Sequence, residues 1–490
     1  MGLGLFVFHL AVNRQYGFHG DELYFIVCGN RPAWGYVDHP PFVPLMARLA
    51  TDLMGTNLVA LRFFPALALG VSCVLTGWLA RRLGAGLFGE CLAALCFVFA
   101  PLMLRLGAFL NIPCFEVLFW LIAAHLLVNI CQRNEPRWWP VIGLLSGFAL
   151  LNKHTTLFLG VGMAVGLVLT HRRKDLVTPW PWLGGAAAFV IFLPNLFWQY
   201  RHDWATLEFV RTINATVMQD TSRVEFMLAQ VVLMNVFGAV VWLAGLIFFL
   251  RSKAGGTYRF LGWVFLTVLV IMLVFNAKVY YLVPAYPMLM AGGAVLLERW
   301  LSGRWGIAVR AALSSAIVIM GLIFLPIVSP IGPLEWKEDY IGQVLGFMLD
   351  DPADLTFDFR YQHCRPEELQ AFRAVYEKVP AEEQQECVIL TNEYDTASEV
   401  NVLGRDLGLP KAVSGNNSYY LWGTAGATGE CVIAFGYGED LLRACFQEVT
   451  NAGVISCPWR DTSGTGRPLF LCRRPTANLE QLWLRFKVFR

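Results

Sequence analysis

The chain has 490 residues, of which 56% are hydrophobic and only 15% are charged. Its mean hydropathy of +0.52 lies far outside the range of soluble globular domains, so the sequence predicts a polytopic α-helical membrane protein. The formal net charge is +2 and the arginines are scattered in small clusters, so we expect no nucleic-acid partner.

Apolar segments follow one another from the N-terminus to about residue 328. A membrane-spanning helix needs about 20 residues, and this length criterion predicts roughly eleven spans. The first segment is short for a span, which leaves open a true start further upstream. The segments lie at 1–12, 57–79, 88–104, 112–131, 139–151, 155–170, 182–198, 226–250, 260–276, 281–297 and 306–328.

Arginine and lysine are enriched in cytoplasmic loops, and their positions therefore orient the chain. With a cytoplasmic N-terminus, the basic clusters all fall on the inside. Eleven crossings then leave the C-terminus outside the membrane. The clusters lie at 81–82, 133–137, 172–174, 251–259 and 299–310.

The composition becomes polar at the end of the last apolar segment. We therefore predict a transmembrane domain at 1–330 and an extracytoplasmic α/β domain at 331–490. Helical periodicity appears at 366–379 and 439–449, and short apolar runs that indicate buried strands appear at 387–390, 431–435 and 468–472.

Six cysteines lie in this polar region. An even number fits disulfide bonds in an oxidising compartment, but six cysteines allow fifteen pairings, so the connectivity stays open. They are Cys364, Cys387, Cys431, Cys445, Cys457 and Cys472.

The first outer loop, at about 13–56, is the main polar interruption of the apolar region. It contains the neighbouring carboxylates Asp21 and Glu22, and then Asp38 and His39 before two prolines. Carboxylates beside membrane spans are costly and usually functional. We predict Asp21 as a general base and Glu22 as its catalytic partner, and we expect Asp38 and His39 to contact substrate. The alternative is an ordinary solvated loop with a helix-capping aspartate and a stiff juxtamembrane turn.

Cations on the same predicted face complement these acids. Arg105, Lys153 and Lys278 lie at outer boundaries, and together they are suited to bind a phosphate at a low-dielectric boundary. The alternative for each is that its side chain reaches to the membrane surface, and Tyr281 has the parallel alternative of an aromatic-belt residue. No His/Cys cluster with zinc spacing accompanies them.

The order of these motifs resembles a known family. The Asp-Glu pair, WGYVDHPP at 34–41, the Lys-x-Thr turn at Lys153 and KVYYLVPAYP at 278–287 are similar to the GT-C membrane glycosyltransferases of the dolichyl-phosphate-mannose protein mannosyltransferase type. The likeness is greatest to their bacterial relatives, which include the lipid A aminoarabinose transferases. It covers roughly 16–300, and the segment 416–423 also looks like bacterial members.

The resemblance implies a polyprenyl-phosphate-linked sugar donor and a protein, lipid A or glycan acceptor at the outer, periplasmic face of the cytoplasmic membrane. It places Asp21 as the base, with Glu22 and Asp38 beside it, and it places Lys153, Lys278 and Tyr281 near the lipid phosphate. His39 occupies a position where some relatives carry a lysine near that phosphate. Asn111 stands where relatives commonly carry an acid, which leaves the acceptor and a divalent cation open; no other cofactor is implied.

Two other protein classes compete with an enzyme. A lipid or solute transporter or flippase also carries intramembrane charges, but it tends to show repeated halves and polar groups at the midplane. Here the polar residues gather at one face and the halves differ, which favours the enzyme. A membrane anchor for the outer domain would need far fewer spans.

Overall fold

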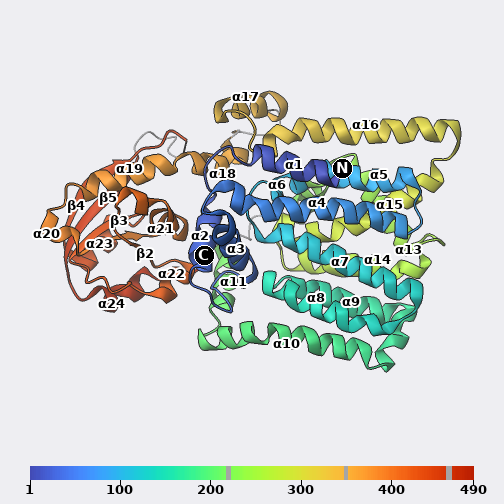
Figure 1. Ribbon diagram of the computed structural model, residues 1–490, viewed down its shortest axis with the longest axis horizontal. Coiled ribbons are helices and arrows are strands. Elements are labelled where there is room, and N and C mark those ends of the chain that lie inside the picture. Colours follow the sequence, from blue (N-terminus) through green and yellow to red (C-terminus); the bar gives the residue numbers. More distant parts are fainter. Residues whose placement is uncertain (217–221, 347–350, 352, 460–465) are drawn as a thin grey trace.

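The computed structural model describes residues 1–216, 222–346, 351, 353–459 and 466–490. Long helices run side by side along the long axis of the molecule, and a smaller domain with a sheet lies at one end of them (Figure 1). This arrangement confirms the predicted class, a polytopic helical protein with a C-terminal α/β domain.

The apolar segments predicted from the sequence all form helices. Short 3-10 turns join several of them, including η1 (Pro136–Trp138), η2 (His171–Val177), η3 (Gly256–Tyr258) and η4 (Val279–Ala285). The helices of the bundle are α1 (Gly2–Val12), α4 (Leu58–Arg82), α5 (Leu87–Val98), α6 (Pro101–Leu106), α7 (Ile112–Arg133), α8 (Trp139–Asn152), α9 (Thr156–Leu169), α10 (Trp180–Arg201), α12 (Arg223–Leu233), α13 (Gly238–Leu250), α14 (Arg259–Val274), α15 (Tyr286–Trp300) and α16 (Gly303–Val328).

The number of membrane crossings stays a prediction. Among the described residues, six helical stretches are long and apolar enough to cross a membrane, or seven if α12 and α13, which meet at 107°, form one broken span. Helices α1, α5 and α9 are apolar but shorter. The eleven predicted segments are therefore all helical, whereas eleven full crossings are not established by helix length.

Burial distinguishes the centre of the bundle from its lipid-facing rim. The hydrophobic stretch that contains α15 is 83% buried, whereas those of α10 and α16 are only 11% and 17% buried. Glycines allow α15 to approach α13 closely, because a Cβ on Gly245 would lie 1.9 Å from the carbonyl oxygen of Leu289. Helix α15 is thus the core of the bundle, and α10 and α16 lie at its edge.

The C-terminal domain is built on a five-stranded mixed sheet of order β2-β1-β3-β5-β4. Strands β1, β2 and β3 are parallel, and β5 is antiparallel to both β3 and β4. The strands are β1 (Cys387–Thr391), β2 (Ala412–Ser414), β3 (Cys431–Phe435), β4 (Phe446–Ile455) and β5 (Arg467–Pro475). The other elements are α19 (Arg365–Tyr376), α20 (Ala381–Gln384), α21 (Tyr394–Val402), η5 (Gly404–Leu407), α22 (Asn417–Trp422), α23 (Glu439–Cys445), α24 (Leu479–Leu482) and η6 (Trp483–Phe486).

One predicted helix in this domain, at 439–449, is confirmed over its first seven residues and wrong over its last four. Helix α23 ends at Cys445, and the residues predicted to continue it belong to β4. The edge of β5 offers unpaired backbone groups, and pairing with them outweighs the local helical periodicity. The strands predicted at 387–390, 431–435 and 468–472 and the helix predicted at 366–379 are confirmed.

Two disulfide bonds form within this domain. They join Cys364 to Cys457 and Cys387 to Cys431, the second pair linking neighbouring strands. In the described part of the chain, Cys445 and Cys472 are free and buried. The even number of cysteines therefore correctly indicated disulfides, although only four of the six take part.

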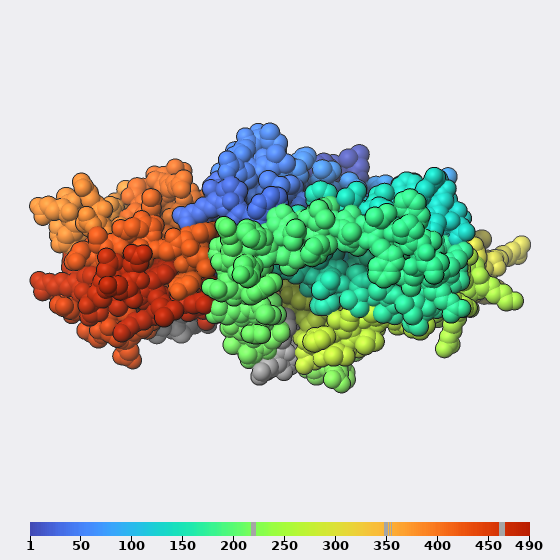
Figure 2. All heavy atoms as spheres, turned by 90° about the horizontal axis from the view of Figure 1, so that it is seen from below, coloured from blue at the N-terminus to red at the C-terminus, as the bar shows by residue number. Residues whose placement is uncertain are grey.

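Five helices lie at the junction of bundle and domain (Figure 1). They are α2 (Gly20–Gly29), α3 (Phe42–Met54), α11 (Ala205–Thr216), α17 (Leu334–Leu345) and α18 (Ala353–His363). The predicted outer loop at 13–56 thus contains two helices. Figure 2 shows α11, in green, standing against the C-terminal domain, where Glu208 pairs with Lys487 at 2.8 Å.

Candidate functional site

Helix α2 begins with a capping box that fixes the direction of its first turn. The side chain of His19 accepts a hydrogen bond from the backbone of Asp21 at 3.1 Å, and the side chain of Glu22 accepts one from the backbone of His19 at 2.9 Å. Gly20 allows the C-terminal domain to come close, since a Cβ there would lie 2.7 Å from the Cβ of Asp395. The two carboxylates therefore point in different directions at a tight domain junction.

Asp21 faces a cavity of about 360 Å³ between α2 and the C-terminal domain. Its side chain is 39% exposed, and its Oδ1 accepts a hydrogen bond of 2.8 Å from the Tyr394 hydroxyl of α21. One carboxylate edge is thus held by the protein while the group stays accessible to a second molecule. The cavity is also lined by His19, Asp358, Arg365, Glu393, Asp395, Asn416 and Arg490.

Glu22 points inward and is fully buried. Arg62 of α4 binds both of its oxygens, with Nε 2.9 Å from Oε1 and the terminal nitrogen 2.8 Å from Oε2. The backbone amides of Leu110 and His19 fill the remaining acceptor sites. Burial alone would raise the pKa of Glu22, but Arg62 and these amides lower it overall. This geometry makes Glu22 a support for α2 and leaves no oxygen for a substrate.

Asp38 and His39 lie behind α2. The Tyr24 hydroxyl donates to Asp38 at 2.9 Å, and burial raises the pKa of this carboxyl although His39 and Tyr24 oppose the shift. His39 is 2% exposed, and its Nδ1 donates to the carbonyl of Pro40 at 2.9 Å. Asp38 is partly accessible near Asp21, whereas His39 is enclosed by protein.

Arg105 belongs to a charged cluster on the bundle side of the Asp21 cavity. It pairs with Asp358 at 2.7 Å, and Nε2 of His19 lies 3.7 Å from the other Asp358 oxygen. Burial lowers the pKa of His19, but its hydrogen bond to Asp358 and the charges of Asp358 and Asp21 raise it overall. The guanidinium also lies over the ring of Phe359. Arg105 is therefore engaged within the protein, beside the predicted base.

Asn111 is the N-cap of α7. Its Oδ1 accepts from the backbone of Cys114 at 2.9 Å, and its amide donates to the carbonyls of Leu106 and Phe109. The side chain is 5% exposed. The hydrogen bonds that it makes serve the start of the helix, so the structure offers no contact through which Asn111 would hold a substrate.

Lys153 lies at the turn between α8 and α9 and contacts Glu116, an acid that was not predicted from the sequence. Its Nζ is 3.0 Å from Glu116 of α7, and the hydroxyl of Thr155 donates to the other Glu116 oxygen at 2.7 Å. The ammonium also lies 4.1 Å from the ring centre of Tyr281 and 5.4 Å from that of Tyr280. Lys153 and Tyr281 are thus brought together, and their contact with a lipid phosphate stays a prediction.

Lys278 directly precedes η4 as its N-cap residue, two residues before Tyr280. Its side chain is half-buried, and within the described ranges it has no ion-pair or hydrogen-bond partner. Tyr280 packs edge-on against Tyr281 and lies 5.4 Å from the Lys153 ammonium. The η4 segment therefore lies on the cation side of the site.

Three residues that contact the predicted site residues were not predicted from the sequence, for different reasons. Glu116 carried a signal, as a lone acid inside the apolar run LNIPCFE. Tyr394 and Asp358 carried none, because only folding brings the C-terminal region onto α2. No group of three or more His, Cys, Asp or Glu side chains suited to a metal ion occurs among the residues that the structure describes.

Sequence comparison supports the resemblance over part of the chain. Residues 38–198 match the model of the family described as dolichyl-phosphate-mannose-protein mannosyltransferase. The lipid A galacturonosyltransferase RgtD of Rhizobium johnstonii is 27% identical over 198 residues, which are 40% of this chain and 41% of that relative. The family match includes Lys153 and Glu116 but begins after Asp21.

Solved structures support the fold over nearly the whole chain. ArnT from Cupriavidus metallidurans, in a crystal structure bound to undecaprenyl phosphate, has a TM-score of 0.59 at 15% identity, with 96% of each chain covered. The oligosaccharyltransferase of Archaeoglobus fulgidus, in a complex with Zn and sulfate, has a TM-score of 0.51 at 12% identity, covering 88% of this chain and 68% of that one. The chain therefore has the GT-C membrane glycosyltransferase fold of ArnT, and its residues 38–198 match the dolichyl-phosphate-mannose-protein mannosyltransferase family.

Proposed function

We propose that this chain is a membrane glycosyltransferase that moves a monosaccharide from a polyprenyl-phosphate donor to an acceptor hydroxyl or amine. The observation that carries the proposal is the position of Asp21, accessible in a cavity at the domain junction and held by Tyr394. The ArnT fold and the similarity to RgtD support it.

In the proposed reaction Asp21 removes the proton from the acceptor as its oxygen or nitrogen attacks the anomeric carbon of the sugar. The bond between that carbon and the phosphate oxygen breaks, and its electron pair leaves with the lipid phosphate. A single displacement of this kind inverts the anomeric configuration. Tyr394 donates to Asp21 from the C-terminal domain and orients the carboxylate for this transfer.

The leaving phosphate needs positive charge nearby, because it departs without a general acid. We assign this role first to Lys278, because its side chain has no ion-pair partner among the residues that the structure describes. Lys153 contributes a charge that it shares with Glu116, and Tyr281 packs against its ammonium. Arg105 is paired with Asp358 and His39 is enclosed, so we assign both a supporting role.

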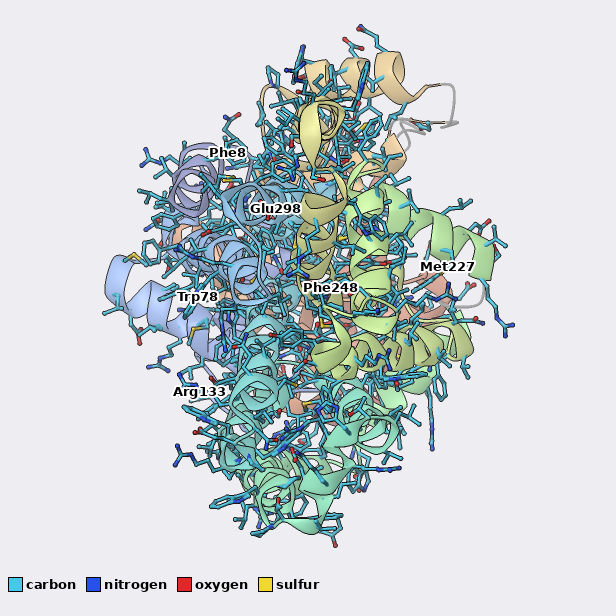
Figure 3. All side chains as sticks on the ribbon, turned by 90° about the vertical axis from the view of Figure 1, so that its right-hand side faces the viewer. Phe8, Trp78, Arg133, Met227, Phe248 and Glu298 are labelled. Carbon is cyan, nitrogen blue, oxygen red and sulfur yellow. A yellow bond between two sulfur atoms is a disulfide. The ribbon has the colours of Figure 1, made fainter. Side chains whose placement is uncertain are left out.

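We assign the C-terminal domain and the site to the outer, periplasmic face of the cytoplasmic membrane. Helix α7 starts next to Leu110, which contacts Glu22, and its 22 residues end at Arg133 of a predicted inside cluster. Arg133 is labelled in the end-on view of the bundle from the side away from this domain (Figure 3). The two disulfide bonds are consistent with an oxidising compartment. An acceptor such as lipid A or another envelope glycan would approach from this side.

The test is Asp21→Asn in a strain that lacks the native protein, with glycolipids and surface glycans analysed by mass spectrometry. We expect the sugar addition to disappear while the variant still inserts and unfolds at the wild-type temperature. Asp52→Asn is the matched control, because Asp52 is an exposed carboxylate on α3 that pairs only with the neighbouring Arg48 among described residues. Full transfer by Asp21→Asn would refute the assignment of the base.

A further inference from the structure

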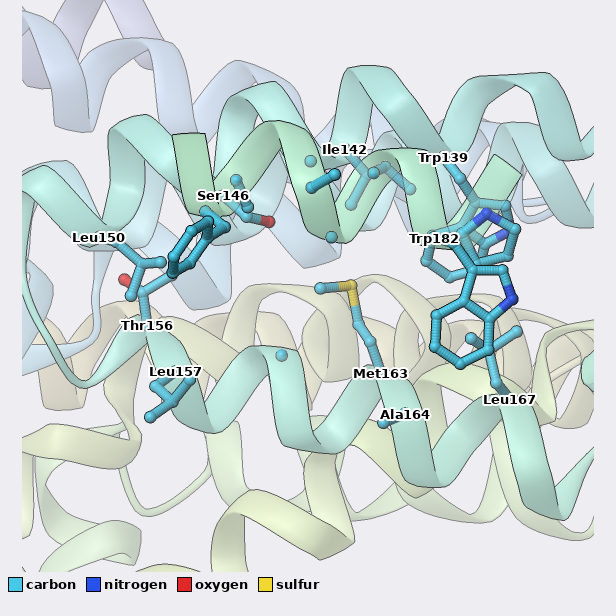
Figure 4. Close-up of a pocket in the computed structure, with 18 of the residues that line it drawn as sticks. Trp139, Ile142, Ser146, Leu150, Thr156, Leu157, Met163, Ala164, Leu167 and Trp182 are labelled. Atoms are coloured by element: carbon cyan, nitrogen blue, oxygen red, sulfur yellow. The ribbon is translucent and has the colours of Figure 1, made fainter. Parts of the chain in front are cut away.

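Two of the cavities outside the Asp21 site differ in character. The first, of about 780 Å³, lies between α8, α9 and α10 and is lined by apolar side chains such as Ile142, Met163 and Leu167 (Figure 4). The second, of about 440 Å³, lies between the C-terminal half of α2 and the C-terminal domain. Because more of its surface is polar than apolar, the second cavity is the better candidate for a charged ligand, and we call it the Arg31 cavity.

The Arg31 cavity and the Asp21 cavity lie at opposite ends of one helix pair. Helices α2 and α21 pack side by side. Tyr394, at the start of α21, contacts Asp21 near the start of α2. Val402, at the end of α21, and Asn30, which caps the end of α2, both line the Arg31 cavity. Asn30 lies nine residues after Asp21, so at ~1.5 Å per residue the two are about 13 Å apart along the helix, and a ligand that reaches both is longer than one sugar ring.

Three cations and one acid line the Arg31 cavity. Arg31 follows the end of α2, Arg405 and Asp406 belong to η5, and Lys411 precedes β2. All four side chains are exposed, and within the described ranges none of the three cations forms an ion pair. An excess of unpaired positive charge attracts an anion, and guanidinium groups suit the oxygens of a phosphate or carboxylate.

An aromatic ring and a fixed amide form the wall beside these charges. Trp422 of α22 lines the cavity, and the Arg31 guanidinium lies 4.5 Å from the centre of its ring. Asn401 of α21 donates to the Ala412 carbonyl at 2.8 Å and to the Tyr419 hydroxyl at 3.1 Å, which ties α21 to β2 and α22. The wall is therefore held in place, and an aromatic ring beside polar groups suits the apolar and polar faces of a sugar.

The Arg31 cavity adjoins the membrane surface. Thr56 lines the cavity and stands two residues before the start of α4, a helix long and apolar enough to cross the membrane. Leu45, Leu49 and Leu53 of α3 are exposed at a spacing of four residues, so they form one apolar stripe on that helix. A stripe of this kind lies on the bilayer surface. A ligand in the cavity therefore lies beside the headgroups of membrane lipids.

We propose that the Arg31 cavity binds a phosphate group on the glycan of a lipid-linked acceptor. The proposal rests on the proposed function and adds the class of acceptor, a phosphorylated glycolipid with at least two sugars. One sugar reaches Asp21 and reacts there, while a phosphate on another sugar pairs with Arg31, Arg405 and Lys411. The sugar that carries this phosphate packs against Trp422. The phosphate takes no part in the reaction, but it selects the acceptor and fixes its orientation.

The test removes two of the three charges. The double variant Arg405→Gln, Lys411→Gln changes exposed side chains that have no ion-pair partner among the described residues. Lys378→Gln is the matched control, because Lys378 is another exposed lysine of the same domain without a described ion-pair partner and does not line the cavity. The thermal unfolding temperature of each protein is measured to confirm that the variants fold.

Three probes are bound to the full-length protein in phosphatidylcholine nanodiscs. They are lipid A with its phosphates, lipid A from which the phosphates have been removed, and undecaprenyl phosphate. We expect the double variant to bind phosphorylated lipid A about tenfold more weakly than wild type, because it loses charge-assisted hydrogen bonds, and the control to bind it equally. Binding of the other two probes should be the same in all three proteins.

Each other outcome refutes a defined statement. Undiminished binding of phosphorylated lipid A by the double variant, or no binding of it by wild type, would overturn the proposal and leave the proposed function standing. Equal weakening for both forms of lipid A would also overturn it, because the phosphate would then not be the recognised group. If phosphatidylglycerol displaced phosphorylated lipid A from wild type as well as lipid A itself does, the cavity would bind bulk lipid headgroups and not the acceptor. If wild type bound no undecaprenyl phosphate, the proposed function itself would fail.

Discussion

Substitutions in the buried pair of Glu22 and Arg62 test whether Glu22 supports the structure while Asp21 acts as the base. Glu22 is fully buried, and four protein donors occupy its two oxygens. Glu22→Gln removes the negative charge and leaves the Arg62 guanidinium buried without a counter-ion. Breaking a buried pair in this way costs about 3–5 kcal/mol, whereas breaking an exposed pair costs about 0–1 kcal/mol.

The assay is thermal unfolding of the purified protein in nanodiscs, with kcat measured at a temperature where the variant is folded. We expect Glu22→Gln to lower the unfolding temperature strongly, and Asp52→Asn, which breaks the exposed pair with Arg48, to change it little. The double variant with Arg62→Met should recover part of the loss, because no unpaired charge then remains. Residual kcat should stay well above that of Asp21→Asn.

The pH dependence adds an independent check. The pKa of Glu22 in the folded protein lies below its ordinary value of 4.5, so its stabilisation is present above that pH and is lost as the pH falls further. The difference in unfolding temperature between wild type and Glu22→Gln should therefore shrink in acid. If Glu22→Gln instead kept wild-type stability and lost all activity, the positioning role would be refuted and the catalytic role predicted from the sequence would stand.

Three further predictions concern the residues around the site. Tyr394→Phe should lower kcat by roughly ten- to a hundredfold, since a hydrogen bond to a charged group contributes about 1.5–3 kcal/mol, and a normal kcat would refute its role in holding Asp21. Lys278→Met should raise the KM for the lipid donor without changing the unfolding temperature. Lys153→Met should raise the KM and also lower the unfolding temperature, because Glu116 would stay buried without its ion-pair partner. Equal unfolding temperatures of the two variants would contradict this difference. Burial, with the charge of Arg105, lowers the pKa of Lys337 from 10.5 to about 7, so stability should rise between pH 7 and 10 in wild type and not in Lys337→Met.

The local sequence was sufficient to predict those helices and strands whose formation depends mainly on one physical effect. Runs of apolar residues predicted every helix of the bundle, because the backbone in a bilayer must satisfy its own hydrogen bonds. The apolar runs at 387–390 and 431–435 predicted central strands for the related reason that burial outweighs other preferences there. The helix predicted at 439–449 was wrong from residue 446 on, because Phe446–Ile455 pairs as a strand with the edge of β5, which no local pattern reveals.

Only some residues of the candidate site could be predicted from the sequence, for a similar reason. Polar residues next to membrane spans predicted Asp21 and Lys153 as site residues, and the family resemblance added Tyr281; the structure brings the last two into contact. Adjacent acids looked alike in the sequence, yet helix geometry turns Asp21 toward a cavity and Glu22 toward Arg62. The role of each acid depends on contacts with residues that are 40 or more positions away in the chain, and the sequence alone does not show which residues these are.

What the sequence by itself determined was the membrane class, the positions of the helices and the fold family, and it predicted the polar segment beside which a reaction would occur. The membrane class, the helix positions and the polar segment follow from the cost of placing polar groups near hydrocarbon, which is a property of composition and order, whereas the fold family came from the resemblance of the motifs. Only the tertiary structure decided that Tyr394 holds Asp21 and that Glu116 pairs with Lys153. These features depend on distances between segments remote in the chain, and packing alone sets those distances.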